Sequence, residues 1–383
     1  MSKYLTKMAA LIPATVILSA CIQEEPLNAE ADILACDLSS DKKILVLAAD
    51  TAMSVTSITS NIDIPVKLGS NLTQCAPKFI LTEGATISPA SGSVHDFSNG
   101  KSVTYTVTSQ DGQWKRYYKV AYVSQELTTQ YDFESFILTN GDKYQIVTEV
   151  VDGNIMSNWW GSGNPGFCMA NGTAKPEEYP SAIVPGGKSG NCLQCVTRSA
   201  GTFGAQAGMP IAPGNLFLGS FNVAQALKEP LAATRFGLPF RQVPTTIKGY
   251  YKFKAGEQMT DKEMKPVDGK DIFNAYAMFY ENTDENGKSI MVDGNTSNID
   301  DPEKFSPYMV LYGKIKDAKE TDEWTEFSFE MEPVNGKTID PERLKNSGYN
   351  FSVVFSSSLR GDIFQGAIGS TLMIDEVTVA CQK

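Results

Sequence analysis

Histidine is almost absent from this chain of 383 residues, because its only histidine is His95, in the segment SGSVHDFSNG. A zinc site built on two histidines is therefore excluded, and a His-based nucleophilic triad would depend on this single residue. The G-x-S-x-G pattern that surrounds many catalytic serines is also missing. We interpret His95 as an exposed loop residue without a catalytic role.

Positive charge is scarce, with 33 lysines and arginines against 44 acidic residues and a formal net charge of -11. Such a chain has little sequence-independent attraction for the phosphates of nucleic acid or for anionic membrane surfaces. We therefore expect no nucleic-acid partner.

The N-terminal apolar run, residues 8–20, is too short to span a bilayer well. It follows Lys3 and Lys7 and ends in LSAC, which resembles the lipobox of bacterial lipoproteins, in which Cys21 becomes the acylated first residue. Residues 1–21 are then the lipoprotein signal and residues 22–32 an acidic tether. The resemblance implies an outer-membrane lipoprotein that faces the cell surface or, alternatively, the periplasm. A plain cleaved signal and an uncleaved anchor are the alternatives.

Six further cysteines could form disulfides in an exported protein, but the sequence does not give their pairing. Cys192 and Cys195 form a C-x-x-C pattern within GNCLQCVTR. A redox pair of this kind needs a helix N-terminus, whereas this segment reads as a strand that would place the two thiols on opposite faces. We expect no redox role.

Short alternating apolar runs dominate the chain, and helical periodicity is scarce. Residues 33–124 predict an immunoglobulin-like β-sandwich, with a final hairpin turning at Asp111-Gly112 and with Trp114 as a packing residue. A polar bridge then leads to residues 130–383, which predict a large jelly-roll β-sandwich with short helices only near residues 222–230 and 340–348. The predicted fold class is thus all-β.

The segment SNWWGSGNPGF contains Gly161, Gly163 and Gly166 in a G-x-G-x-x-G pattern. That pattern binds dinucleotides only between a strand and a helix, and the breakers in CMANGTAKPEEYP predict that no helix follows. We therefore interpret the segment as a sugar-binding loop. A sugar needs an aromatic platform and polar groups around its rim. The predicted platform is Trp159 or Trp160, at least one of which should be exposed, and the predicted rim is Asn158, Ser162 and Asn164.

Strand alternation adds further candidates for sugar contacts. In FNAYAMFYE, the side chains of Asn274, Tyr276 and Tyr280 share the face opposite the predicted core and could line a concave sheet. In YNFSVVFSSS, the small polar residues Asn350, Ser352 and Ser356 could leave room for a ligand. Arg198 is a possible donor to hydroxyl or carboxylate groups.

Several motifs in order over residues 131–383 resemble the putative carbohydrate metabolism domain (PCMD) family of Bacteroidetes lipoproteins; they are WWGSGNPGF, CLQCVTR, GNLFLGSF, TIKGYYKFKAG, FNAYAMFYEN and FQGAIGSTLMIDEVTV. The resemblance extends to the preceding immunoglobulin-like domain, a spacer in such lipoproteins. It implies a galactose-binding-like jelly roll with a link to glycans but no assigned reaction. We expect a carbohydrate-binding domain whose partner is a polysaccharide or oligosaccharide. The alternatives are a glycoside hydrolase and a structural or adhesive surface protein.

Carbohydrate-binding jelly rolls often hold a structural Ca²⁺, and oxygen ligands suit a chain so poor in histidine. Asp132, Glu134 and Asp375 lie where the domain opens and closes, so they are the candidate ligands; no other cofactor is expected. A glycosidase would need two carboxylates across the sugar, but the sequence does not single out a pair among its 44 acidic residues. We therefore regard an enzymatic role as the less favoured prediction.

Overall fold

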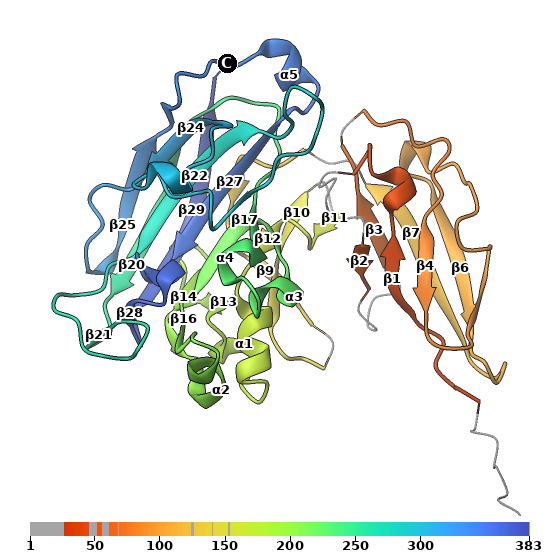
Figure 1. Cartoon of the computed structure of the whole chain (residues 1–383), viewed down its shortest axis with the longest axis horizontal. Helices are drawn as coiled ribbons and strands as arrows, with labels where there is room; N and C mark the ends of the chain where they lie inside the picture. The colour runs from red at the N-terminus through yellow and green to blue at the C-terminus, as the bar shows by residue number, and fades with distance from the viewer. Residues whose placement is uncertain are drawn as a thin grey trace, which may run out of the picture.

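The computed structural model describes residues 27–45, 52–55, 61–67, 69–123, 126–139, 141–151 and 154–382. Cys21, the predicted acylation site, lies outside these residues. Among them, no helix has the length and apolar character needed to cross a bilayer. Figure 1 shows a smaller and a larger body, both built mainly of strands, so the all-β prediction is confirmed.

The N-terminal domain is a sandwich of two sheets around its own core. One sheet has the order β2-β1-β4, and the other has the order β3-β7-β6-β5, in which β3 runs parallel to β7. The core includes Phe97, Tyr105 and Tyr118, all fully buried. The strands are β1 (Ile33–Asp37), β2 (Ala52–Ser54), β3 (Asn61–Pro65), β4 (Lys78–Leu81), β5 (Thr86–Ser88), β6 (Ser102–Thr108) and β7 (Lys115–Val123).

The predicted final hairpin of this domain is confirmed, because β6 and β7 pair antiparallel from Ser102↔Ala121 to Thr108↔Lys115. The predicted packing role of Trp114 is wrong. The indole is 62% exposed, because Trp114 precedes β7 in the turn and points away from the core. His95 is half-buried rather than exposed, and its ring contacts Phe97 and Tyr105 edge to face.

The C-terminal domain packs a six-stranded sheet against a nine-stranded sheet (Figure 1). The six-stranded sheet has the order β13-β14-β29-β20-β25, with β8 added beside β29. Its members are β8 (Gln130–Tyr131), β13 (Ser181–Pro185), β14 (Asn191–Val196), β20 (Pro244–Lys254), β25 (Thr321–Glu330) and β29 (Thr371–Cys381).

The nine-stranded sheet has the order β23-β18-β17-β27-β22-β24-β26, with β12 beside β17 and β19 beside β27. Residues that alternate on β22 and β27, such as Phe279, Phe351 and Phe355, face the six-stranded sheet and are fully buried. The members are β12 (Trp160–Gly161), β17 (Asn215–Phe221), β18 (Thr234–Phe236), β19 (Leu238–Pro239), β22 (Asn274–Glu281), β23 (Val292–Asp293), β24 (Met309–Lys314), β26 (Glu332–Pro333) and β27 (Tyr349–Ser356).

Smaller elements decorate the C-terminal domain. A three-stranded sheet has the order β11-β10-β9, and two short ladders pair β15 with β16 and β21 with β28. The helices near residues 222–230 and 340–348 are confirmed, and three others were not predicted. The bounds are β9 (Ser135–Leu138), β10 (Gln145–Val151), β11 (Asn154–Met156), β15 (Arg198–Ser199), β16 (Ile211–Ala212), β21 (Met259–Thr260), β28 (Gly366–Ala367), α1 (Asn164–Ala170), α2 (Gly201–Gln206), α3 (Val223–Ala226), α4 (Pro230–Ala233) and α5 (Pro341–Lys345).

Candidate functional site

The tryptophan-glycine segment forms a packed corner of the C-terminal domain. Trp160 and Gly161 make up β12, which pairs antiparallel with Leu218 and Phe217 of β17. A Cβ atom on Gly161 would lie only 2.6 Å from the ring of Phe217. Gly161 is therefore needed for the close approach of two strands, which is a packing role.

Helix α1 follows this corner directly, so the prediction that neither strand nor helix flanks the glycines is wrong. Pro165 stands in the first turn, where its missing N–H costs nothing, and the breakers that begin at Asn171 come after the helix rather than within it. The N–H of Gly163 donates to Oδ1 of Asn215 at 2.8 Å, and the buried Asn164 side chain bonds to both backbone groups of Ser181. These bonds fix the corner to the neighbouring strands.

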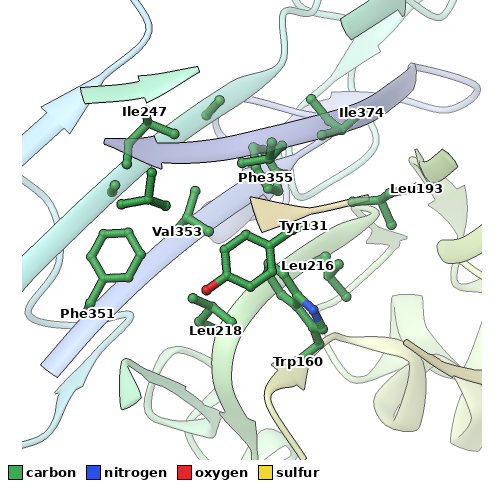
Figure 2. Close-up of a cluster of buried hydrophobic side chains, with 14 of the residues drawn as sticks. Tyr131, Trp160, Leu193, Leu216, Leu218, Ile247, Phe351, Val353, Phe355 and Ile374 are labelled. Carbon is green, nitrogen blue, oxygen red and sulfur yellow. The ribbon is translucent and has the colours of Figure 1, made fainter. Parts of the chain in front are cut away.

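Both indoles are buried, which contradicts the expectation that at least one of them is exposed. Trp159 is 5% and Trp160 is 6% exposed. The ring of Trp160 packs edge to face on Tyr131, with ring centroids 5.1 Å apart, and lies among core side chains that include Leu216 and Leu218 (Figure 2). The glycines allow the chain to fold both indoles inward, so neither ring is an open sugar platform.

Glu149 on β10 lies beneath Trp160 in this interior. Its Oε1 accepts a hydrogen bond from Trp160 Nε1 at 2.8 Å. Burial raises the pKa of this carboxyl to about 7, the indole hydrogen bond lowers it in part, and the charge of Asp132 raises it further. Glu149 was not predicted from the sequence, because the run YQIVTEV reads as an ordinary strand.

A hollow of about 260 Å³ lies beside the corner and brings together four of the predicted site residues, Asn158, Trp160, Ser162 and Asn164. None of its lining residues is charged. Aromatic and aliphatic groups alternate with hydroxyl and amide groups around it. The other lining residues are Tyr144, Gln145, Ile146, Val147, Ser157, Gly161, Pro165, Ser181, Leu216, Gly219, Ser220 and Phe221.

The side chains at the mouth of this hollow differ from those that the sequence suggested. Asn158 is exposed, and Tyr144, Ser162 and Phe221 are half-buried, whereas Asn164 is buried and occupied by its bonds to Ser181. The aromatic surface therefore comes from Tyr144 and Phe221. Neither carries a sequence signal that separates it from ordinary strand residues.

A larger groove of about 490 Å³ lies at the edge where β24 and β25 diverge. Its walls carry charged residues, and two of its lysines are already paired, Lys314 with Asp300 at 2.8 Å and Lys316 with Glu332 at 3.2 Å. A neutral sugar would have to displace water from these charges, which is unfavourable without new partners. We therefore treat the uncharged hollow as the candidate site.

The predicted concave face of β22 is covered rather than open. Tyr280 is fully buried and its hydroxyl donates to the carbonyl of Phe236 at 2.5 Å, while Asn274 and Tyr276 are half-buried. The segments around β18 and β23 cover this face and form a second apolar cluster with it. Asn350 and Ser352 on β27 are buried as well and bond to neighbouring groups, so they leave no room for a ligand there.

Two of the three candidate calcium ligands accept hydrogen bonds from the same loop. Asp375 accepts from the backbone N–H groups of Lys188 and Ser189, and Glu134 accepts from that of Asn191. Asp132 is exposed. Within the described part of the chain, no group of three or more His, Cys, Asp or Glu residues is placed to hold a metal ion. Glu134 and Asp375 anchor the 186–191 loop through these hydrogen bonds, and the calcium site stays a prediction.

Two other predictions concern residues outside the hollow. Arg198 is half-buried on β15, and its Nε atom is buried without a hydrogen-bond partner.

Cys192 and Cys195 lie on β14, as the strand prediction required, and burial raises the pKa of both thiols to about 12. Thiols that stay protonated at neutral pH are poor nucleophiles.

Two glycines of the corner provide a matched test of its packing. Gly161→Ala should lower the free energy of unfolding by about 1–3 kcal/mol, because the new methyl group would overlap the Phe217 ring. Gly163→Ala should change it by less than about 0.5 kcal/mol, since the nearest atom, on Asn215, lies 3.6 Å away. Urea unfolding of both variants measures the difference, and equal values would contradict this packing role.

Fold and site together define a protein of two β-sandwiches with an uncharged hollow in the larger one. The family described as the putative carbohydrate metabolism domain (PCMD) matches residues 132–380, and the description "SGBP, N-terminal" matches residues 45–121. The chain belongs to the PCMD family. Both matches place it among proteins with a carbohydrate-related role.

Solved structures of two Bacteroides proteins are among those similar to this chain. A protein of Bacteroides thetaiotaomicron, described as a putative glycoside hydrolase, is 44% identical, with a TM-score of 0.76, over 94% of this chain and 99% of its own. A protein of Bacteroides vulgatus with the same description is 40% identical, with a TM-score of 0.62, over 67% of this chain and all of its own. No curated protein matches this sequence.

Proposed function

We propose that this chain is an envelope lipoprotein whose C-terminal jelly roll binds a neutral sugar unit of a polysaccharide or oligosaccharide in the hollow beside Trp160. The observation that supports it most is the lining of the hollow, which contains no charged residue in a protein of net charge -11. Apolar walls with a few amide and hydroxyl groups suit a sugar, whose faces are apolar and whose rim carries hydroxyls. A volume of about 260 Å³ lies just below the range of roughly 300–1,000 Å³ for drug-sized ligands, and so suits one sugar ring.

The N-terminal domain would then act as a spacer between the membrane and the sugar-binding domain. The lipobox at Cys21 and the acidic tether support a position in the outer membrane, facing the cell surface or the periplasm. Labelling of the expressed protein with radioactive palmitate tests the acylation on which this placement depends, with Cys21→Ala as the control that should lose the label.

Asn158→Ala is the sharpest test of the binding site. Asn158 is exposed at the mouth of the hollow, so its amide can bond to a sugar hydroxyl, and its loss should weaken binding about tenfold. Titration of intrinsic tryptophan fluorescence with a panel of host and plant polysaccharides gives the affinity. Asn286→Ala, at an exposed asparagine of another turn, is the matched control and should bind as the unaltered protein does.

A panel in which no glycan binds, or in which both asparagine variants bind equally, would reject the hollow as the sugar site.

Glycoside hydrolysis is the second candidate, favoured by the descriptions of the two similar structures. No carboxylate lines the hollow, whereas Asp317, Glu326 and Glu330 line the groove between β24 and β25. If the protein were a hydrolase, this groove would supply its acids. Incubation with each binding glycan, followed by an assay for new reducing ends, distinguishes the two functions, and our proposal predicts that no product forms.

A further inference from the structure

The chain enters the N-terminal domain beside the turn of the β6–β7 hairpin. The N–H of Asp111 donates to the carbonyl of Asn28 at 3.3 Å, and the N–H of Asn28 donates to Oε1 of Gln110 at 2.9 Å. From this turn, β7 runs for nine residues to Val123, just before the second domain. Figure 1 shows the chain entering at the end of the domain away from that junction.

This entry end carries a group of exposed apolar side chains, which we call the entry rim. Trp114 and Tyr117 follow the hairpin turn, and Leu27 precedes Asn28. The exposed fractions are 62% for Trp114, 59% for Tyr117 and 58% for Leu27. Single exposed apolar residues are ordinary, but a group at one end of a domain marks an interaction surface.

The distance to the proposed anchor suggests what this surface contacts. Asn28 is the seventh residue after Cys21, and an extended chain spans at most about 3.3–3.6 Å per residue. A domain acylated at Cys21 is therefore held with its entry rim within about 25 Å of the bilayer. Trp and Tyr are the side chains most enriched at membrane interfaces, because one end of each ring system is apolar and the other is polar.

We propose that the entry rim rests on the membrane surface and that the rings of Trp114 and Tyr117 enter the headgroup region of zwitterionic phospholipids. This inference rests on the proposed lipid anchor, but not on the sugar site. Acidic residues near the rim, Glu30, Glu83 and Asp111, disfavour an anionic surface, and Lys115 offsets only part of their charge. The contact would orient the domain and hold the sugar-binding domain away from the bilayer.

The test replaces the natural anchor, so that it does not depend on acylation. Residues 22–383 with an N-terminal hexahistidine are bound to phosphatidylcholine vesicles that contain a nickel-chelating lipid. Tryptophan fluorescence is then compared between vesicles with ordinary and with brominated acyl chains, because bromine quenches only indoles that reach the lipid. We expect quenching in the unaltered protein, loss of that quenching in Trp114→Phe, and its retention in Trp324→Phe, which removes a half-buried indole elsewhere. Replacing half of the phosphatidylcholine with phosphatidylglycerol should reduce the quenching at least twofold.

Three results would overturn the inference. The tethered protein could show no quenching, or Trp114→Phe could be quenched as strongly as the unaltered protein. A glycan could also shift the fluorescence of Trp114 in the absence of vesicles, which would make the rim a sugar-binding surface. Because the hollow beside Trp160 is tested separately through Asn158, either proposal can fail while the other stands.

Discussion

Trp160→Ala is expected to lower the free energy of unfolding by about 3–5 kcal/mol, a large part of the 5–15 kcal/mol that a typical domain has. The indole is buried against Tyr131 and Phe133, with ring centroids 5.1 and 5.5 Å away, so its removal leaves a cavity in the main core. The substitution also leaves the buried Glu149 without its Nε1–H donor. Urea unfolding followed by circular dichroism gives the change.

Trp114→Ala is the matched control, since the same side chain is removed from an exposed position. It should change the free energy of unfolding by less than about 0.5 kcal/mol in solution. Trp160→Phe should lower the free energy of unfolding by an amount between those of the two alanine variants. The phenyl ring keeps part of the packing of the indole but cannot donate a hydrogen bond to Glu149. If Trp160→Ala cost no more than Trp114→Ala, the corner would be a surface loop and the packing described above would be wrong.

The second large expected effect is a pH dependence of the free energy of unfolding, caused by the titration of Glu149. Burial raises the pKa of Glu149 from an ordinary value of 4.5 to about 7, so the folded protein favours the neutral carboxyl. This contribution to stability is fully present below the unfolded pKa and is lost as the pH rises through 7. Between pH 5.5 and 8.5 it should fall by about 2 kcal/mol, since about 1.5 pH units separate pH 5.5 from the pKa of the folded state and each unit is worth about 1.4 kcal/mol.

Glu149→Gln isolates this contribution, because the amide resembles the neutral acid and its oxygen can still accept from Trp160 Nε1. The difference in unfolding free energy between the variant and the unaltered protein should therefore change with pH as Glu149 titrates. Asp132→Asn removes a neighbouring charge that raises the pKa of Glu149. We therefore expect the loss of stability to move to lower pH in this variant, and a move to higher pH would contradict our account. An unchanged pH dependence in Glu149→Gln would show that Glu149 does not titrate in this range.

The strands could be predicted because their burial follows local alternation. On β7, Tyr118, Val120 and Tyr122 are buried whereas Lys119 and Ala121 are not, as the pattern required. The hairpin turn at Asp111-Gly112 is also local, since glycine readily adopts the positive φ of 72° found at Gly112. These features depend on residues close together in sequence.

The site depends on contacts between distant segments, which alternation does not reveal. Trp160 is buried because Gly161 lets β12 approach Phe217, more than fifty residues later in the chain. The outer face of β22 looks open in the sequence but is closed by Phe236 and Val292 from other segments. Helix α1 was missed for a local reason, since Pro165 marks a helix start and the breakers after residue 170 mark its end.

Hydrogen–deuterium exchange with a glycan that binds tests the sugar-binding proposal most directly. The exchange of backbone amides is compared in the presence and absence of that glycan. We predict protection in peptides that cover residues 157–165 and 216–221, which line the hollow, and none in peptides that cover residues 314–330. Protection confined to residues 314–330 would contradict our account and place the glycan in the charged groove between β24 and β25.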